Sequence, residues 1–343
     1  MDLMNIKEYV AARKEAVYAK ILEYLPKSEP LEYSEMLSEY SRRQGKYMRP
    51  GLLMLAGELF GATLEELVLP AAIMQISEDW MLMHDDLEDG SEMRRGKPAL
   101  HRIYGNWQAL NAGDAVQMRM WRMIMDYTKA NGLKKGTALF DRMYSILDET
   151  VEGQYLDIKF STEIKQIGKA SEDMYFDIVG KKTSCYTVYG PMQIGAVVAD
   201  QPKKVCEILE RIGRDAGKAF QITDDILDMT ADEKEFGKKR YGDLYEGKLT
   251  LIMLHAYNAA NRAERARIDR IYKKERNSKT KAEIDFLAYV IEKYGSVEYA
   301  RAEASRYGRM AQETLRDNQT LFPENEYKEV FTSAVESLFI RKV

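Results

Sequence analysis

Two short acidic segments carry the residues whose types and spacing are best suited to chemistry. Both repeat two adjacent aspartates followed three residues later by a third, and the six residues are Asp85, Asp86, Asp89, Asp224, Asp225 and Asp228. Each segment follows an apolar run with helical spacing. In an α-helix, residues four positions apart share a face, so Asp85 lies beside Asp89 and Asp224 beside Asp228. Each segment therefore predicts a helix face on which carboxylates converge.

Converging carboxylates need a compensating positive charge, because like charges at this spacing destabilise a helix, and more so when they are buried. Mg²⁺ suits that role, since it takes oxygen ligands, retains waters and bridges carboxylates to substrate phosphates. The spacing and glycine of an EF-hand calcium loop are missing, and the three histidines and two cysteines give no zinc pattern. One such aspartate pattern is weak evidence for a metal site, because a solvated acidic turn also explains it. Two such patterns beside basic residues favour a magnesium site.

Basic residues stand in short motifs around these acids. The motifs are GKYMRP at residues 45–50, RRG at 94–96, KKT at 181–183, and GK and GKLT within 237–250. In most proteins, cations near carboxylates form ordinary surface ion pairs. Here they recur in short motifs, most of which contain glycine, which makes them candidate phosphate-binding residues.

With these motifs in order, the sequence closely resembles the trans-prenyl diphosphate synthases, the family that contains farnesyl and geranylgeranyl diphosphate synthases. The resemblance runs through most of the chain as GKYMRP, HDDLEDGSEMRRGKP, LNAGD, EGQYLDI, KKTS, AFQITDDILD and GKKRYGDLYEGKLT. It implies the isoprenoid synthase fold, an all-α bundle around a central apolar cavity. It also implies a homodimer.

The resemblance implies a magnesium-dependent prenyltransferase that joins isopentenyl diphosphate to an allylic diphosphate, either dimethylallyl, geranyl or farnesyl. The allylic C–O bond must ionise, and cations in a preorganised site stabilise the charge that develops on the departing diphosphate. The double bond of isopentenyl diphosphate then attacks the allylic cation, and loss of a proton completes the step. A cation of this kind also requires the exclusion of water.

Carried over residue by residue, the resemblance gives each motif a role. Both aspartate clusters would hold two or three Mg²⁺ from facing helices, and the ions would clamp the allylic diphosphate. The residues that match the isopentenyl diphosphate positions are Lys46, Arg49, Glu78 and Arg95. Those that match positions around the allylic diphosphate are Arg94, Lys182, Thr183, Gln221, Lys238 and Lys248. The expected catalytic residues are the six aspartates with Arg94 and Lys182, and those expected behind them are Gln154 and Asp157.

Glu78 departs from the commoner family pattern, which offers histidine or glutamine to isopentenyl diphosphate at this position. Seven residues are nearly two helical turns, so Glu78 should share the face of Asp85 at about 10 Å. A carboxylate there would repel a diphosphate. We expect Glu78 to pair with Lys46, Arg49 or Arg95, which would weaken the binding of isopentenyl diphosphate without abolishing turnover.

Product length should depend on the side chains that close the apolar pocket below the first cluster. Trp80 matches the position where bulky residues limit the product in related short-chain enzymes, and Ser77 and Met81 are the other candidates. An ideal helical wheel turns Trp80 about 140° from Asp85 and favours Met81. Plain core packing is an equal alternative for Trp80. A large residue at this floor favours a C15 or C20 product, with C20, geranylgeranyl diphosphate, as our first choice.

The elements that must position these residues are helices. One amphipathic stripe follows helical spacing and consists of Val205, Ile208, Leu209, Ile212, Ala216 and Ala219. The region from residue 251 to 343 also has helical character, and alternating strand patterns are scarce. We expect breaks at Pro26, Pro30, Arg49-Pro50, Gly96–Pro98, Asn131-Gly132, Gln201-Pro202, Gly237–Gly247 and Pro323, which leave about ten or more helices.

Composition bounds the class of protein. No linker divides the 343 residues, so we expect one all-helical domain over residues 1–343. A formal charge of −4 argues against a nucleic-acid binder. No apolar stretch is long enough to span a bilayer and the N-terminus lacks a signal-peptide core, so we expect a cytoplasmic protein. Cys185 and Cys206 are expected to be buried thiols.

Two alternatives to a prenyl diphosphate synthase remain open. A terpene cyclase would share the helical architecture and one aspartate-rich motif, but the second aspartate cluster and the basic residues of the isopentenyl diphosphate site argue against it. A non-catalytic subunit that regulates an active synthase would keep the helical shell. Such subunits normally lose aspartates, whereas both clusters are intact here.

Overall fold

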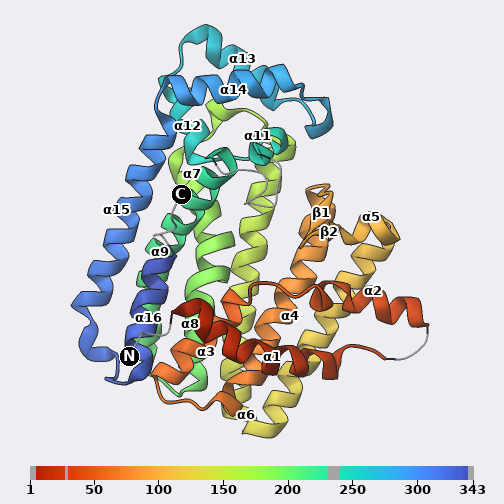
Figure 1. Ribbon diagram of the computed structural model, residues 1–343, viewed down its shortest axis with the longest axis vertical. Coiled ribbons are helices and arrows are strands. Elements are labelled where there is room, and N and C mark those ends of the chain that lie inside the picture. Colours follow the sequence, from red (N-terminus) through yellow and green to blue (C-terminus); the bar gives the residue numbers. More distant parts are fainter. Residues whose placement is uncertain (1–4, 28–29, 231–239, 339–343) are drawn as a thin grey trace. The chain divides into compact units, whose positions relative to one another are not determined.

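The computed structural model describes residues 5–27, 30–230 and 240–338, and they are mostly helical (Figure 1). Among these residues the only strands are β1 (Met93–Arg94) and β2 (Lys97–Pro98), which pair as an antiparallel hairpin. The predicted all-α fold is therefore confirmed. No helix within the described ranges is long and apolar enough to cross a bilayer.

The chain divides into two compact units, each composed of three stretches of sequence. Unit one comprises Met1–Ile146, Gly190–Glu210 and Asn318–Ala334. Unit two comprises Leu147–Tyr189, Arg211–Asp317 and Val335–Val343. The assignment of residues 1–343 to a single domain stays a prediction.

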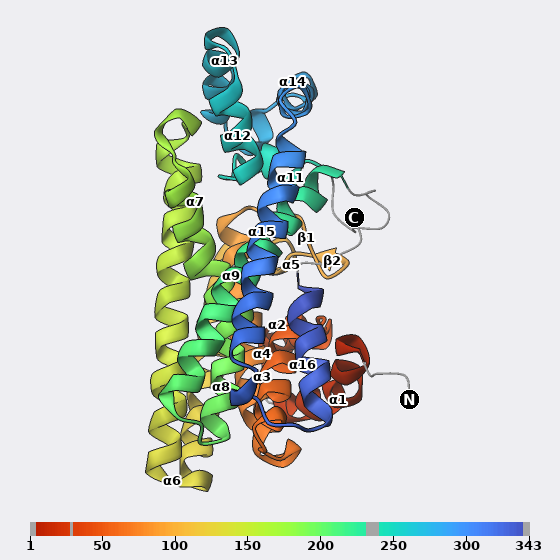
Figure 2. The ribbon, with the colours of Figure 1, turned by 90° about the vertical axis from the view of Figure 1, so that its left-hand side faces the viewer.

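Unit one is built around a tightly packed group of helices. Besides the hairpin, the elements that lie wholly or partly in it are α1 (Ile6–Tyr24), α2 (Leu31–Arg42), α3 (Met48–Leu59), α4 (Leu64–Glu88), α5 (Leu100–Tyr104), α6 (Asn106–Lys159), α8 (Gly190–Val198), α9 (Lys203–Thr230), η5 (Gln319–Leu321) and α16 (Glu326–Ser337). Helix α3 packs against both α4 and α8 (Figure 2). The approach of α8 is close, because a Cβ atom on Gly195 would lie 2.2 Å from the carbonyl oxygen of Leu53.

Helix α4 has clear start and stop signals. At its start, Thr63 and Glu66 form a capping box: the Thr63 side chain accepts from the Glu66 amide, and the Glu66 carboxylate accepts from the Thr63 amide. At its end, Gly90 adopts a left-handed conformation with φ of 62°. The hairpin that follows turns at Arg95 and Gly96, both with positive φ, as a type I′ hairpin turn requires.

Helix α6 is a helical hairpin rather than one straight helix. Gly132 has φ of 85° and ψ of 164°, which interrupts the helix at the predicted Asn131-Gly132 break. The two arms lie against each other, since the rings of Trp121 and Phe140 are 5.5 Å apart and a Cβ atom on Gly136 would meet the side chain of Thr128. This break is therefore confirmed.

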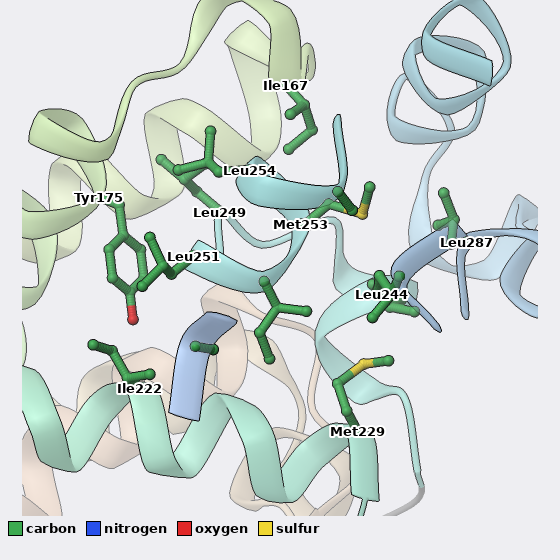
Figure 3. Close-up of a cluster of buried hydrophobic side chains, with 14 of the residues drawn as sticks. Ile167, Tyr175, Ile222, Met229, Leu244, Leu249, Leu251, Met253, Leu254 and Leu287 are labelled. Carbon is green, nitrogen blue, oxygen red and sulfur yellow. The ribbon is translucent and has the colours of Figure 1, made fainter. Parts of the chain in front are cut away.

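Unit two has its own hydrophobic core. Its further elements are η1 (Phe160–Ile164), η2 (Ile167–Lys169), α7 (Glu172–Ile178), η3 (Val179–Tyr189), α11 (Gly242–Glu246), α12 (Leu251–Ala259), α13 (Arg262–Tyr272), η4 (Arg276–Ser278), α14 (Lys281–Lys293) and α15 (Ser296–Asp317). Buried side chains from α7, α9, α11, α12 and α14 form one cluster (Figure 3).

All six residues of the predicted stripe on α9 are buried, and Cys185 and Cys206 are buried free thiols as expected.

Two expected breaks need correction. Pro50 does not interrupt a helix but lies in the first turn of α3, where a proline without an amide hydrogen is tolerated. Within the expected break over Gly237–Gly247, the described residues include the short helix α11. Packing of Leu244 into the core of unit two explains a helix that glycine content alone does not predict.

Candidate active site

The first aspartate cluster lies at the C-terminal end of α4 and is held by Arg94 and Tyr40. Arg94 Nε donates to both oxygens of Asp86, at 2.9 and 3.0 Å, and Arg94 Nη2 donates to Asp85 Oδ2 at 3.3 Å. The hydroxyl of Tyr40 donates to Asp86 Oδ2 at 2.5 Å. Asp86 is fully buried, whereas Asp85 and Asp89 are partly exposed. The middle aspartate is thus anchored, and its two neighbours face the surface of unit one.

Glu78, on the same helix as the first cluster, lies in a group of alternating charges contributed by several elements. Its Oε1 atom is 3.2 Å from Arg49 Nη1 and 3.4 Å from Arg95 Nη2. Arg95 also donates to Asp79 Oδ1 at 3.0 Å, and burial raises the pKa of Asp79. The expected pairing of Glu78 with a basic residue is confirmed for Arg49 and Arg95; Lys46 lies exposed in the loop before α3.

The backbone around this charged group is strained. Three non-glycine residues there adopt left-handed conformations: Gln44 with φ of 46°, Tyr47 with φ of 55° and Arg95 with φ of 50°. Each such residue costs on the order of 1 kcal/mol. The two segments also touch, because a Cβ atom on Gly45 would lie 3.0 Å from Arg95 Nη2. Strain of this kind gathers at functional sites, which supports a role for the GKYMRP and RRG motifs.

The second aspartate cluster lies on α9 and repeats the anchored middle position. Asp225 is buried, and its carboxylate accepts from the Tyr175 hydroxyl and from Gln221 Nε2, both at 2.8 Å. Thr183 Oγ1 donates to Gln221 Oε1 at 2.7 Å, which fixes the amide. Burial raises the pKa of Asp225 well above its usual range, and the nearby carboxylate of Asp243 raises it further.

Asp228 and the basic residues complete this part of unit two. The Asp228 carboxylate accepts from the backbone amides of Gly242, at 3.1 Å, and Asp243, at 3.2 Å. Lys182, in the π-helical segment η3, lies 2.7 Å from Asp157, the residue expected behind it. Lys248 lies 2.9 Å from Glu246. Lys238 lies outside the described residues.

Comparison with known proteins decides the family. The sequence profile described as Polyprenyl synthetase matches residues 30–288. This chain belongs to the polyprenyl synthetase family. It is therefore a prenyltransferase, and the expected resemblance is confirmed.

Two relatives and two solved structures agree with this assignment. The chain is 33% identical to a geranylgeranyl diphosphate synthase of Methanosarcina mazei, over 92% of this chain and 94% of the relative. It is 31% identical to a geranylfarnesyl diphosphate synthase of Natronomonas pharaonis, over 98% of both chains. A polyprenyl synthase from Caulobacter crescentus, solved with calcium and isoprenyl diphosphate, has a TM-score of 0.84 at 25% identity, over 98% of this chain and 97% of that one. A geranylgeranyl pyrophosphate synthase from Corynebacterium glutamicum, solved with isoprenyl diphosphate and magnesium, has a TM-score of 0.86 at 20% identity, over 99% and 100%, and supports the fold.

The candidate chain-length residues of this family member lie on α4. Trp80 is 6% exposed, and its ring meets that of His84 edge to face at 5.7 Å. Ser77 is fully buried and donates to the carbonyl oxygen of Met74, while Met81 is half-buried. The packing fits the core-packing interpretation of Trp80, and the influence of these three residues on product length stays a prediction.

Several residues that shape the site were missed in the sequence. They are Tyr40, Asp79, Tyr175 and Asp243. The two tyrosines could not be recognised in the sequence, because the chain has 22 tyrosines and no motif distinguishes Tyr40 or Tyr175 from the others. Asp79 directly follows Glu78, and Asp243 lies in the GDLYEGK segment, so proximity to a motif was a usable signal for these two.

The side chains at both clusters fit a hard divalent cation in their chemistry. The ligand atoms would be carboxylate oxygens. In unit two, the nearby carboxylate of Asp243 helps to raise the pKa of buried Asp225, which indicates a surplus of negative charge. Across the described ranges, no group of three or more His, Cys, Asp or Glu side chains is placed to hold a metal ion by itself. Mg²⁺ commonly completes its shell with waters and substrate phosphates, so one or two carboxylates per ion suffice.

The predicted residues thus gather in two places. Unit one brings together the first cluster, Arg94 and the Glu78 group, and unit two brings together the second cluster, Thr183 and Gln221. That the two aspartate-bearing helices face each other stays a prediction.

Proposed function

We propose that this prenyltransferase condenses isopentenyl diphosphate with an allylic diphosphate and releases geranylgeranyl diphosphate. The observation that carries the proposal is the pair of intact aspartate clusters, each with a buried, anchored middle carboxylate. The 33% identity to a geranylgeranyl diphosphate synthase supports the product. Intact clusters also argue against the alternative of a non-catalytic regulatory subunit.

The proposal gives the basic residues of unit one the isopentenyl diphosphate. Lys46, Arg49 and Arg95 would bind its diphosphate: the guanidinium groups of the two arginines present paired donors that match phosphate oxygens, and the Lys46 ammonium supplies a point charge. Glu78 occupies both arginines in the structure and must yield them, at least in part, when the substrate enters. Binding of isopentenyl diphosphate is therefore weaker than the arginines alone would give.

The remaining basic and polar residues would surround the allylic diphosphate. They are Arg94, Lys182, Thr183, Gln221, Lys238 and Lys248. Arg94 and Lys182 already contact carboxylates, so each is oriented before substrate binds. Magnesium, when bound by Asp85, Asp86, Asp89, Asp224, Asp225 and Asp228, supplies positive charge that stabilises the departing diphosphate. Because Tyr40 and Tyr175 occupy the carboxylates of Asp86 and Asp225, and backbone amides occupy that of Asp228, we expect Asp85, Asp89 and Asp224 to make the closer contacts to metal.

Geranylfarnesyl diphosphate is a second candidate product. The observation that favours it is the 31% identity to a geranylfarnesyl diphosphate synthase over 98% of this chain. The two relatives are named for C20 and C25 products, so a C15 product gains no support from them.

Product analysis tests the proposal. The purified full chain is incubated with Mg²⁺, isopentenyl diphosphate and, in turn, dimethylallyl, geranyl and farnesyl diphosphate, and the alcohols released by phosphatase are separated and weighed by mass spectrometry. We expect C20 geranylgeraniol, and C25 if the second candidate holds. Asp85→Asn and Asp224→Asn serve as inactive controls. Absence of any condensation product from the wild type would favour the regulatory subunit.

A further inference from the structure

The short helix α11 connects two residues of the proposed diphosphate site. At its N-terminal end, the amides of Gly242 and Asp243 donate to the carboxylate of Asp228. Just beyond its C-terminal end stands Lys248, whose ammonium is paired with Glu246 of the same helix. Any shift of α11 therefore moves both the Asp228 carboxylate and the Lys248 ammonium.

A helix of five residues is not stable by itself and must be held by its surroundings. Leu244 anchors one face in the core cluster of unit two, to which Met229 and Leu287 also belong (Figure 3). Arg276 binds Glu246 at 2.6 Å. These contacts leave the carbonyl groups at the C-terminal end of α11 in need of a donor.

Lys279 is that donor. Its Nζ atom lies 3.0 Å from the carbonyl oxygen of Leu244 and 2.8 Å from that of Tyr245, and the residue is only 6% exposed. The chain leaves the helix at Gly247 in a left-handed conformation, and a Cβ atom there would lie 2.8 Å from Lys279 Nζ. The loop therefore closes directly over the buried ammonium.

We propose that Lys279 is a positioning residue for the prenyl transfer: it fixes the C-terminal end of α11, and through α11 it orients Asp228 and Lys248 toward the allylic diphosphate. The inference rests on the proposed function of those two residues. A buried cation is unfavourable unless its donors are used, and burial lowers the pKa of Lys279 to about 8. No residue of the two aspartate clusters contacts Lys279 in the described part of the chain, so it acts on Asp228 indirectly, through α11.

The test combines a structural measurement with kinetics on the full chain. Lys279→Met keeps the length of the side chain and removes the donor. Lys281→Met is the matched control, because Lys281 is 83% exposed and pairs with Asp285 on the surface of α14. Hydrogen exchange of the backbone amides is measured by mass spectrometry, and the Michaelis constants for both substrates and the half-saturating Mg²⁺ concentration are measured separately.

In Lys279→Met we expect exchange over residues 242–248 to rise about tenfold while α12 and α14 exchange as in the wild type. We expect the half-saturating Mg²⁺ concentration and the Michaelis constant for the allylic diphosphate to rise at least about fivefold, with the constant for isopentenyl diphosphate unchanged. Lys281→Met should match the wild type. Unchanged exchange over residues 242–248, unchanged kinetics, or faster exchange spread equally over α12 to α14 would each overturn the proposal.

A second variant covers the case in which Lys279→Met does not fold. Arg276→Gln removes a further polar contact to Glu246 at the end of α11, from a side chain that is 35% exposed. The same pattern with smaller changes supports the proposal, and wild-type exchange with wild-type kinetics overturns it. The product assay of the wild type reports separately on the proposed function, because the exchange measurement needs no substrate.

Discussion

At the residue scale, the middle aspartate of each cluster is held by a buried tyrosine. Asp86 and Asp225 are buried, and each accepts a hydrogen bond from a buried tyrosine on another helix, Tyr40 or Tyr175. A buried carboxylate is costly unless donors satisfy it. The repeated arrangement fixes the middle carboxylates, while Asp85, Asp89 and Asp224 are partly exposed and Asp228 is buried.

Glu78 is the residue whose replacement should improve the enzyme. In Glu78→Gln, Arg49 and Arg95 lose a competing carboxylate and the incoming diphosphate loses a like charge. We expect the Michaelis constant for isopentenyl diphosphate to fall about fivefold, the equivalent of about 1 kcal/mol, with kcat little changed. Initial rates at saturating allylic substrate provide the measurement.

A nearby acid provides the control for that experiment. Glu39 pairs with Arg43 at 3.0 Å and lies outside the proposed substrate site. Glu39→Gln should leave both Michaelis constants unchanged. If Glu78→Gln behaves in the same way, Glu78 does not compete with the substrate.

Substitution of Trp80 tests whether this residue limits product length. Replacing this buried ring by alanine opens space on α4 and costs about 3–5 kcal/mol of stability. We expect Trp80→Ala to release products at least one isoprene unit longer than the wild type, as seen by chromatography after phosphatase treatment. Met81→Ala tests the competing prediction from the helical wheel, and Trp121→Ala controls for the loss of a tryptophan on α6. An unchanged chromatogram for Trp80→Ala would remove it from this role.

At the scale of elements, short and strained segments carry much of the site. The hairpin presents Arg94 and Arg95, and α11 supports Asp228. Both are too short to be stable alone, so side chains from longer helices hold them. Their stability should respond to changes in those few contacts.

The pH dependence of stability reports on the contact between Lys279 and α11. The pKa of Lys279 is lowered from 10.5 to about 8 by burial, partly opposed by Glu246 and Glu275 and reinforced by Lys165 and Arg276. Unfolding therefore takes up a proton between these pH values, and stability rises as pH increases from about 8 to about 10.5. The gain is at most on the order of 3 kcal/mol.

Urea unfolding at several pH values between 7.5 and 10.5 measures this effect. Lys279→Met lacks the titrating group, so its unfolding free energy should rise less than that of the wild type over the same range. The difference between the two curves removes the contribution of all other lysines and tyrosines. Parallel curves would contradict the assignment of a lowered pKa to Lys279.

At the scale of the whole molecule, exposed apolar residues gather on the α6 hairpin. On the part of α6 that belongs to unit one, the exposed apolar residues are Trp107, Leu110, Met118, Met125, Leu133, Phe140 and Tyr144. Trp107 is 80% exposed and Leu133 is 75% exposed, which is costly in water. We propose that this face forms the interface of the expected homodimer.

Charge placed on that face should dissociate the dimer. We expect the double variant Met118→Lys, Phe140→Lys to have half the mass of the wild type in light scattering after size-exclusion chromatography, because lysines would be buried without partners. Met310→Lys, on α15, is the control and should keep the wild-type mass. A wild-type dimer that persists in the double variant would place the interface elsewhere.

The sequence by itself determined the family, the helical fold and the two aspartate clusters. These features are local: aspartates four residues apart share a helix face, and the apolar stripe from Val205 to Ala219 repeats at helical spacing. The residue types needed for the chemistry lie in short motifs in a fixed order, so they can be recognised without coordinates. The start of α4 at its capping box is equally local.

Only the tertiary structure decided which partners these residues have. Three basic residues were candidates for Glu78, and packing selected Arg49 and Arg95. The tyrosine that anchors Asp86 is 46 residues away in sequence, and Lys279 is 35 residues from the Leu244 carbonyl that it binds. Such contacts depend on how separate helices pack, and the local spacing of residues carries no information about that packing.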